Sequence, residues 1–396
     1  MNDTIASYFT DLGALEALNS VLPSALQISP LVFTITIFLI GCGAVVGALA
    51  TVGGLGTYAE RKISADIQMR QGPNRVGPYG LLQFLADGVK MIMKEDIIPT
   101  QADRGMFIIA PVLCMVGIMA TLVIVPFSSG LTLSSLNVGV IYLLGVGSLI
   151  GIGILLGGYA SNSKWSMLGG MRGASQIISY EVPVTLSMLA IVVLGGSLNF
   201  NVIIEQQSAL PHNWFIFHNP FTFIGFFVFF IGALAEANRA PFDLPEAESE
   251  LVSGYHTEYT GMRFGLFALA EYIEVFVLGG IAVALFLGGY KMPFDATAFL
   301  IKNFSMPEAL ASHVQQFLEV GCFVTKTLLI YYVVIWIRWT LPRLRVDQLM
   351  TICWKYLTPI ALVNLIGCAV WMVAFDGQSM FDLFASIFSG GYGGGH

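Results

Sequence analysis

The sequence has few charges. Asp, Glu, Lys and Arg make up 11% of its 396 residues, whereas an ordinary soluble domain carries about 25%. Hydrophobic residues reach 56%, and the mean hydropathy is +0.77. Apolar runs of about 20 residues, long enough to cross the hydrocarbon core of a bilayer as helices, recur along the chain. This composition argues against a soluble fold and predicts a polytopic membrane protein.

Cysteine and histidine, which hold many metal ions, are scarce and scattered. The five cysteines stand alone without a CxxC pair, and the five histidines all lie outside the apolar runs. A zinc or iron–sulfur site needs several thiolates or imidazoles that converge on one centre. We therefore expect this chain to bind no metal and no redox cofactor, and we interpret the cysteines as small packing residues.

Two further signals are missing. The N-terminus has no basic segment ahead of an apolar run, so we do not expect a cleavable signal peptide. No internal repeat is evident, which argues against transporters built from two related halves. Residues 145–158 come near a dinucleotide-binding fingerprint but lack its spacing and a preceding strand. Their small residues four apart predict close helix packing instead, at Gly147/Gly151 and Gly153/Gly157.

The apolar runs predict an all-α polytopic membrane domain with eight transmembrane helices. We place the spans at residues 31–56, 106–126, 138–158, 176–195, 221–237, 264–289, 316–337 and 357–374. Residues 1–30 then form an N-terminal extension, residues 31–375 the membrane domain, and residues 376–396 a flexible, Gly-rich tail.

Basic residues predict the orientation of this domain, because Lys and Arg are retained on the cytoplasmic side of short loops. All of them except Lys291, Lys302 and Lys326 lie in the segments 57–105, 159–175, 238–263 and 338–356. We therefore expect these four loops to face the cytoplasm. Both termini should then lie on the outer, periplasmic side.

The first cytoplasmic loop contains an amphipathic segment at residues 81–95. Its apolar positions are Leu82, Leu85, Val89, Ile92 and Met93, and its polar positions are Gln83, Asp87, Lys90 and Lys94. Such a helix is too short and too charged to span the bilayer, so we expect it at the membrane interface or docked against protein. The pattern leaves open whether it anchors the chain in lipid or helps to build a cavity.

Charged residues also fall within the predicted spans, at Glu181, Glu236, Glu271, Glu274 and Lys326. A charge at the bilayer centre costs about 2.5–3.5 kcal/mol on insertion scales, so each one needs a reason. Low dielectric raises the pKa of a carboxyl and a nearby cation lowers it, which favours proton transfer near neutral pH. The alternative is a set of buried ion pairs, for instance of Lys326 with one glutamate. Glu274 stays undecided, because a side chain near a helix end can reach the surface.

The stretch 239–259, RAPFDLPEAESELVSGYHTEY, places an acidic cluster on the predicted cytoplasmic side, at Asp243, Glu246, Glu248, Glu250 and Glu258. Acidic runs are usually solvated. Here apolar residues are interleaved with the acids, two prolines stiffen the chain, and the basic loops of the same side supply counter-charges. We therefore expect a folded, charge-paired ledge.

Several long motifs follow one another in the order YAERKISADIQMRQGPNRVGPYGLLQFLADGVKMIMKED, MRGASQIISYEVP, LAEANRAPFDLPEAESELVSGYHTEY, FALAEYIE and IRWTLPRLRVDQLM. Together they closely resemble the H-type membrane subunit (subunit 1 in mitochondria) of respiratory complex I, proton-pumping NADH:quinone oxidoreductase, over residues 45–375. The resemblance implies an eight-helix membrane subunit without a redox centre of its own. Such a subunit forms the membrane side of the quinone chamber, where the electron-transfer arm meets the proton-pumping arm.

The resemblance also implies roles for individual residues. Positions that line the quinone chamber would be Glu60, Arg61, Arg70, Arg338, Phe264 and Phe267. The acidic coupling loop would comprise Asp243, Glu246, Glu248 and Glu250. The proton relay into the membrane would comprise Glu181, Glu236 and Glu271. The supporting polar network would comprise Asp87, Arg239 and Lys326.

The expected substrate is a quinone, either ubiquinone or menaquinone, while NADH, FMN and iron–sulfur clusters are expected on partner subunits. The expected partners are the peripheral-arm subunits of the quinone site and the small and antiporter-like membrane subunits, without nucleic acid. One alternative is the related anchor subunit of a ferredoxin-dependent or hydrogenase-type complex. Another is a stand-alone proton or cation transporter, which would explain the buried carboxylates but not the large basic loops.

Overall fold

The computed structural model describes residues 30–246, 248–292, 308–375 and 377–381. All regular structure within these residues is helical, and seven of the helical segments are long and apolar enough to cross a membrane. They are α3 (Pro30–Ile67), α5 (Arg104–Leu122), α6 (Gly139–Ala160), α7 (Lys164–Gly195), α12 (Gly261–Phe286), α14 (Glu308–Thr340) and α15 (Val346–Thr351) continued by a π-helical turn (Ile352–Leu357) into α16 (Thr358–Ala374). The all-α fold is therefore confirmed for the described residues, with seven segments that could cross a membrane. The N-terminal extension up to residue 29 and the tail from residue 382 on lie outside the described residues.

The predicted span at 221–237 corresponds to α10 (Pro220–Glu236), an apolar helix of 17 residues. Asn219 starts this helix, because its side chain accepts the Thr222 N–H at 2.6 Å while the Thr222 hydroxyl accepts the Asn219 N–H at 3.2 Å. Pro220 follows in the first turn, where a missing N–H has no cost. α10 is shorter than the seven long segments, so an eighth membrane crossing stays a prediction.

Several helices differ from the predicted spans. α3 continues past residue 56 to Ile67, and α7 begins at Lys164, inside the segment predicted as the loop 159–175. α12 ends at Phe286, shortly before Gly288 and Gly289, which both have positive φ. Hydropathy marks only the apolar part of a helix, so it misses polar turns that extend the same helix.

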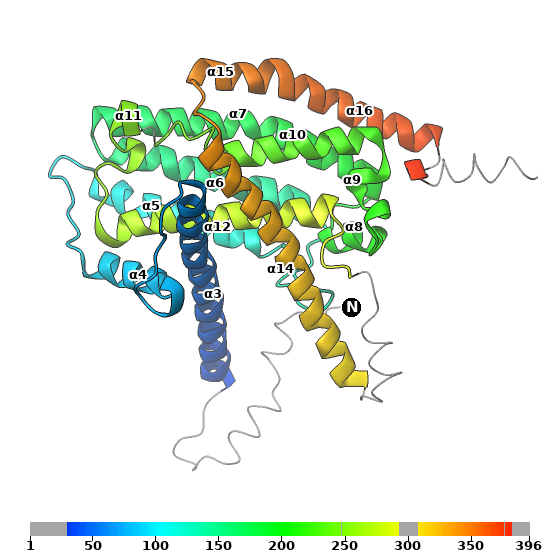
Figure 1. The fold of residues 1–396 in the computed structure, drawn as a ribbon, viewed down its shortest axis with the longest axis horizontal. Coiled ribbons are helices and arrows are strands. Elements are labelled where there is room, and N and C mark those ends of the chain that lie inside the picture. Colours follow the sequence, from blue (N-terminus) through cyan, green and yellow to red (C-terminus); the bar gives the residue numbers. More distant parts are fainter. Residues whose placement is uncertain (1–29, 247, 293–307, 376, 382–396) are drawn as a thin grey trace, which may run out of the picture.

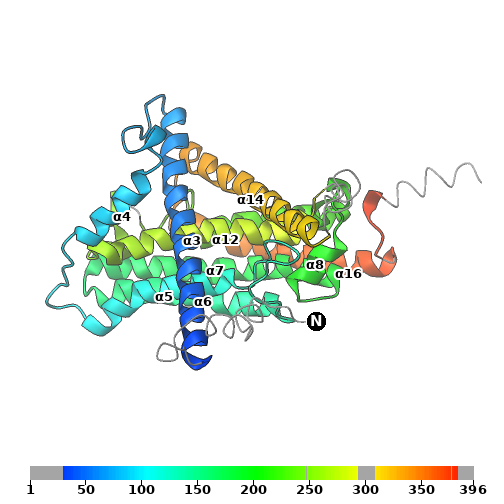
Figure 2. The same cartoon turned by 90° about the horizontal axis from the view of Figure 1, so that it is seen from below.

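Figures 1 and 2 show a bundle of long helices with two further helices set across it. α5, α6, α7, α10, α12 and α16 run along the bundle, and α7 contacts α6, α10 and α16. α3 and α14 cross at a steep angle, and both pack on α12 (Figure 1). α12 is the most buried of the long helices. Of its charged side chains, Glu274 is 5% exposed, and Arg263 and Glu271 are partly buried.

The two ends of the bundle differ (Figure 1). α4 (Gln83–Met93) and α11 (Glu248–Leu251) lie at one end, and α8 (Phe200–Gln206) and α9 (Phe215–His218) lie at the other. α4 confirms the helix predicted within residues 81–95. The first end holds segments of two predicted cytoplasmic loops, those at 57–105 and 238–263.

Glycines bring α5, α6 and α7 close together. A Cβ atom at Gly153 of α6 would collide with Cys114 of α5, and a Cβ at Gly158 would lie 2.6 Å from the Ser166 carbonyl oxygen of α7. A Cβ at Gly151 would lie 3.3 Å from Ile177 of α7. The packing predicted from the small residues of α6 is confirmed at Gly151 and Gly153, and Gly158 adds a further close contact. Gly147 instead faces the Glu236 carboxylate.

Candidate functional site

A buried carboxylate on α3 joins two guanidinium groups from distant parts of the chain. Glu60 is 6% exposed, and its Oε1 lies 2.8 Å from Arg338 Nη1 of α14. Its Oε2 lies 3.4 Å from Arg239 Nη1, in the loop after α10, and Tyr272 of α12 hydrogen-bonds to the same carboxylate. This cluster compensates the buried charges and holds four segments together.

Arg239 is the most enclosed member of this cluster. Its guanidinium carbon lies 4.2 Å from the centre of the Tyr272 ring. Burial alone would lower the pKa of Arg239, but the carboxylates of Glu60 and Glu271 outweigh it and raise the pKa. Its Nε and Nη2 atoms are buried without an acceptor among the described residues. Arg239 thus combines a permanent charge with donors that are free to recognise a polar group.

The loop that carries Arg239 is held in place by Gln176 of α7. The Gln176 Nε2 donates to the carbonyl oxygens of Ala235 and Phe242, at 2.7 Å each, and to Asn238 Oδ1 at 3.1 Å. Gln176 is 1% exposed, so these bonds form away from water, where losing one is costly. This amide fixes the start of the acidic loop and the position of Arg239.

Asp243 is the first carboxylate of the acidic loop. Its Oδ2 lies 2.9 Å from Arg343 Nη2, and its Oδ1 is buried without a donor among the described residues. Burial and the nearby Glu246 carboxylate raise the pKa of Asp243 to about 7, although Arg343 and Arg239 oppose this shift. A carboxyl with a pKa near 7 can bind and release a proton under physiological conditions.

Glu246 connects the acidic loop to α12. Its Oε1 lies 2.9 Å from His256 Nε2 and 3.5 Å from the Tyr255 hydroxyl, which also donates to Glu271 Oε1 at 3.1 Å. The carboxyl groups of Glu246 and Glu271 are hydrogen-bonded to each other. Two carboxyl groups can share a hydrogen bond only when one of them carries a proton. Burial alone would raise the pKa of Glu246, but its bonds to Glu271 and His256 lower it. The pair therefore links the acidic loop to α12 at a point where two carboxyl groups can share one proton.

The other acidic positions of the loop lie nearer the surface. Glu250 is exposed and pairs with Arg172 of α7 at 2.7 Å. Exposed ion pairs of this kind contribute about 0–1 kcal/mol to stability. Glu248 begins α11, but its side chain lies outside the described residues. The coupling roles expected of Glu248 and Glu250 stay predictions.

Carboxyl groups from three helices line one cavity inside the bundle. Glu181 of α7, Glu236 of α10 and Glu274 of α12 line the same space between the helices. The rest of its wall is apolar apart from Thr121 of α5. Glu274 is 5% exposed, so it lies inside the protein and does not reach the surface. The structure therefore brings the predicted relay residues Glu181 and Glu236 together and adds Glu274.

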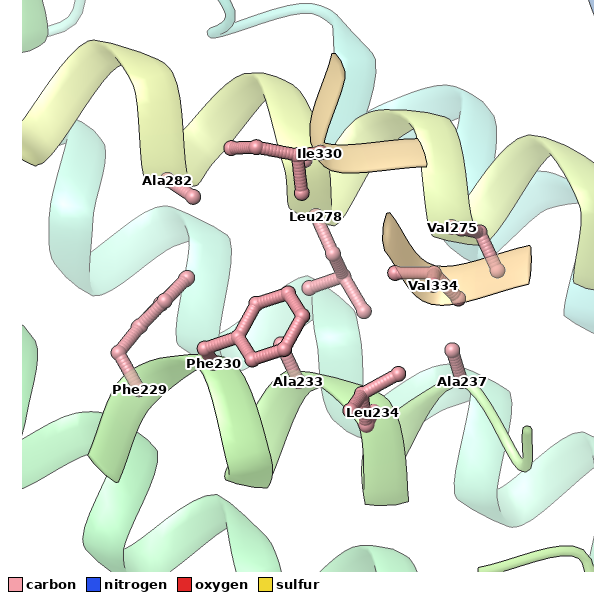
Figure 3. A pocket seen from close by; sticks show the side chains of 11 residues that line it. Phe229, Phe230, Ala233, Leu234, Ala237, Val275, Leu278, Ala282, Ile330 and Val334 are labelled. Atoms are coloured by element: carbon pink, nitrogen blue, oxygen red, sulfur yellow. The ribbon is translucent and has the colours of Figure 1, made fainter. Parts of the chain in front are cut away.

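An apolar pocket adjoins this cavity. Figure 3 shows it between α10, α12 and α14, with Phe230, Leu234 and Val334 among the side chains that line it. Phe229 and Leu278 line both the pocket and the acidic cavity, so they form a wall between the two spaces. The side chains described around the pocket are all apolar, and the pocket therefore does not extend the acidic network.

The helix that carries Glu181, α7, is contacted by the π-helical turn before α16. Pro183 has no N–H, so the carbonyl oxygen of Ser179 loses its helical donor. The Cys353 thiol, in the π-helical turn before α16, donates to this oxygen at 3.0 Å. This contact satisfies the carbonyl group two residues before Glu181 and gives Cys353 a role beyond packing.

Two predicted chamber residues lie apart from the Glu60 cluster. Arg61 forms an ion pair with Asp87 of α4. Burial alone would raise the pKa of Asp87, but hydrogen bonds from Lys90 and Arg61 lower it. Arg70 is exposed beyond the end of α3. The structure thus uses Arg61 and Asp87 to dock α4 on α3, and leaves a quinone role of Arg61 and Arg70 as a prediction.

α4 turns its apolar stripe away from the rest of the chain. Phe84 packs beside Gly54 of α3, and Met91 packs beside Gly265 of α12. The exposed apolar side chains are Leu82, Leu85, Val89, Ile92 and Met93. This exposed stripe can contact lipid or a partner protein.

The two predicted chamber aromatics have different surroundings. Phe264 is partly exposed, and its ring centre lies 5.1 Å from that of His256. Phe267 is 1% exposed and packs edge-on against Tyr255 and Tyr259. Phe267 therefore belongs to the core, while Phe264 borders the Glu246 and His256 contact.

Lys326 is not part of the acidic network. Its Nζ donates to the carbonyl oxygens of Leu287 and Gly289, at 2.9 Å each, and lies 4.7 Å from the centre of the Trp214 ring. These carbonyls follow the C-terminal end of α12, about 24 Å from Glu271 by the rise of the helix. Among the residues that the structure describes, Lys326 forms no ion pair with a glutamate and instead caps a helix end.

Sequence reasoning missed several polar residues of the site, namely Gln176, Tyr255, His256, Tyr272 and Arg343. Gln176 is the first residue of the span predicted at 176–195, where a polar side chain is common and gives no distinct signal. The others became recognisable only through their contacts with Glu60, Asp243 and Glu246. Among the described residues, no group of three or more His, Cys, Asp and Glu side chains could hold a metal ion.

All of the acidic and basic residues described above lie within the part of the chain that matches a known family. A model of the family described as NADH dehydrogenase matches residues 40–369. The chain is 45% identical over 327 residues to the H-type subunit of the NADH-quinone oxidoreductase of Anaeromyxobacter dehalogenans. The aligned region covers 82% of this chain and 79% of the relative. It is 45% identical over 338 residues to the corresponding H-type subunit of Salinibacter ruber, covering 85% and 96% of the two chains. It is 44% identical over 334 residues to NADH-quinone oxidoreductase subunit 8 of Rhodothermus marinus, covering 84% and 96%.

These matches span the long helices and the motifs that carry the resemblance, and they leave the stand-alone transporter without support. The chain therefore belongs to the NADH dehydrogenase family, as the multi-pass, H-type membrane subunit of a proton-translocating NADH-quinone oxidoreductase.

Proposed function

We propose that the Glu60 cluster borders the membrane side of the quinone chamber, and that the carboxyls from Asp243 to Glu181 relay protons from there into the membrane. The observation that carries this proposal is the hydrogen-bonded pair of Glu246 and Glu271. One member belongs to the acidic loop and the other to the most buried long helix. The pair thus connects the loop to the interior of the bundle.

The Glu60 cluster suits the head group of a quinone. A quinone has a polar ring and a long apolar tail, so its site needs an apolar wall with a few placed polar groups. Arg239 keeps two buried donors for such a ring, beside the aromatic rings of Tyr272 and Tyr331. The electrons for its reduction come from partner subunits, where NADH, FMN and iron–sulfur clusters are expected.

Reduction of a quinone to a quinol takes up two electrons and two protons, so it changes the charge beside the acidic loop. Asp243 can respond because its pKa is raised to about 7. Asp243 and Glu246 interact electrostatically, so a change in the charge of Asp243 affects Glu246. Glu246 in turn interacts with Glu271, so the effect reaches α12. The cavity carboxylates Glu236 and Glu181 then continue the path into the membrane.

The orientation and partners follow from the same proposal. The basic loops face the cytoplasm and dock the peripheral arm, α10 forms the eighth span, and both termini face the periplasm. The small and antiporter-like membrane subunits pack against the side of the bundle. Purification of the native complex is expected to return this chain together with flavin and iron–sulfur subunits.

The substitution Glu236→Gln tests the relay, because an amide keeps the size of the side chain but cannot carry the proton. In proteoliposomes that contain the whole complex, the variant is expected to lose most proton translocation per NADH oxidised. The control is Glu205→Gln, which changes an exposed carboxylate of α8 outside the network. Full pumping stoichiometry in the Glu236→Gln complex would contradict the relay.

A further inference from the structure

Glu274 is a buried carboxylate that the proposed relay does not yet use. It lies three positions after Glu271 on α12, so the two side chains are neighbours on one side of the helix. By the helix rise, Glu274 is about 4.5 Å deeper in the bundle than Glu271. Glu271 bonds to the acidic loop, whereas Glu274 lines the cavity with Glu236 and Glu181.

The surroundings of Glu274 do not explain it as a structural ion pair. The side chain is 5% exposed, and within the described part of the chain no hydrogen bond or salt bridge engages its carboxylate. It interacts electrostatically with Glu236 and, more weakly, with Arg239. A buried carboxylate without a partner is expensive unless it is protonated or meets water. A residue that only packs the core would be satisfied by an apolar side chain at this position.

The cavity can supply the contacts that Glu274 lacks. Its wall holds three carboxyl groups and the Thr121 hydroxyl, and a buried water needs about two to four polar partners. Gly147 of α6 leaves room beside the Glu236 carboxylate, since a Cβ there would lie 3.7 Å from its Oε1.

We infer that Glu274 is a proton-carrying group that connects the Glu246 and Glu271 pair to Glu236 and Glu181. This inference rests on the proposed relay and names the step that the relay otherwise lacks. A proton leaves the Glu271 carboxyl and binds the Glu274 carboxylate, through water where the two do not touch. It then passes from Glu274 to Glu236. Glu274 then returns to its starting form, Glu271 has lost one proton and Glu236 has gained it, and no electron is transferred.

Two substitutions at Glu274 separate a proton carrier from a packing residue. Glu274→Gln keeps the shape but removes the titratable group, and Glu274→Asp keeps the titratable group but shortens the side chain. A proton carrier predicts that the Gln variant loses at least half of the protons translocated per NADH, while the Asp variant pumps better than the Gln variant. A packing role predicts the reverse order. The readouts are proton translocation and quinone reduction by the intact complex in proteoliposomes.

Parallel variants distinguish failure of this inference from failure of the relay. If Glu236→Gln abolishes pumping but Glu274→Gln pumps at the level of the Glu205→Gln control, Glu274 is not a proton carrier although the relay stands. If Glu236→Gln also pumps fully, the relay itself is wrong. If neither Glu274 variant assembles, the unmodified complex is treated with an apolar carbodiimide, which reacts with protonated carboxyl groups. Modification of Glu274, found by mass spectrometry together with loss of pumping, supports the inference, and an unmodified Glu274 overturns it.

Discussion

Two carboxylates of the acidic loop have pKa values shifted in opposite directions. Burial raises the pKa of Asp243 to about 7, whereas hydrogen bonds to Glu271 and His256 lower the pKa of Glu246 against the effect of burial. Because Glu246 is charged, it helps to keep the Asp243 proton bound. At neutral pH the loop therefore holds one carboxyl poised to titrate beside one that stays ionised.

The titration of Asp243 predicts a pH dependence of the complex. A raised pKa means that the folded protein keeps the Asp243 proton as pH rises from about 4 to 7, while the unfolded chain has already lost it. The contribution of Asp243 to the free energy of unfolding therefore decreases as pH rises through this window. The Asp243 side chain of the folded protein changes charge near pH 7. The rate of quinone reduction is expected to show an inflection near that pH, which Asp243→Asn removes. Arg343→Gln should move it upward by about 1 pH unit, because Arg343 lowers the pKa. An inflection that persists in Asp243→Asn would assign it to another group.

The Glu60 cluster predicts a large loss of stability from one substitution. Glu60→Gln leaves the guanidinium groups of Arg239 and Arg338 without their shared carboxylate. Breaking a buried pair by removing one partner costs about 3–5 kcal/mol, whereas an exposed pair contributes about 0–1 kcal/mol. Asp87→Asn, which removes the partner of the half-exposed Arg61, is the matched control. Thermal unfolding of the purified complex should separate the two variants, and equal melting temperatures would contradict a stabilising role of the cluster.

At the scale of elements, the contact of α5 with α6 depends on the absence of side chains. A Cβ at Gly153 would meet both the thiol of Cys114 and the backbone of α5, with the Ala110 carbonyl oxygen at 3.2 Å. Gly145, on the same helix, has no atom within 4 Å of the position of its Cβ. The two glycines therefore differ in packing although they have the same helical conformation.

Alanine substitutions at these two glycines should have opposite effects. Gly153→Ala forces the helices apart, and overpacking of this kind costs about 1–3 kcal/mol. Gly145→Ala adds a methyl group in open space and gains about 0.5–1 kcal/mol of helix propensity. The melting temperature of the purified complex is expected to fall in the first variant and to hold or rise in the second. A Gly153→Ala complex as stable as the Gly145→Ala complex would show that α5 and α6 can separate without cost.

The helices were predictable from the sequence because apolar length and periodicity are local properties. Hydropathy located every long helix and the amphipathic α4, but it missed the polar start of α7 at Lys164. The site was less accessible, because its charges are matched across long sequence distances. Glu60 and Arg338, which form one pair, are far apart in the chain. Lys326 looked like a partner for a glutamate, and only the fold shows that it binds carbonyl groups at the end of α12.

For the whole molecule, the distribution of charge predicts how the chain is placed in the membrane and what covers it. The segment after α3 is rich in Arg and Lys and is expected on the cytoplasmic side, where the peripheral arm docks. The segment between α5 and α6 lacks Lys and Arg and is expected on the periplasmic side. Met69 in the first segment is 95% exposed in the isolated chain, and Ser135 in the second is also exposed.

Cysteines at these two positions can test orientation and docking together. In a Cys42→Ala background, Ser135→Cys should react with a membrane-impermeant maleimide from the outside of intact cells. Met69→Cys should react only in inverted vesicles, and more strongly after the peripheral arm has been stripped, because the bound arm covers the basic loop. Labelling of Met69→Cys from outside would reverse the orientation. Equal labelling of Met69→Cys in inverted vesicles before and after stripping would still support the predicted orientation. It would show that the peripheral arm does not dock on the loop between α3 and α4.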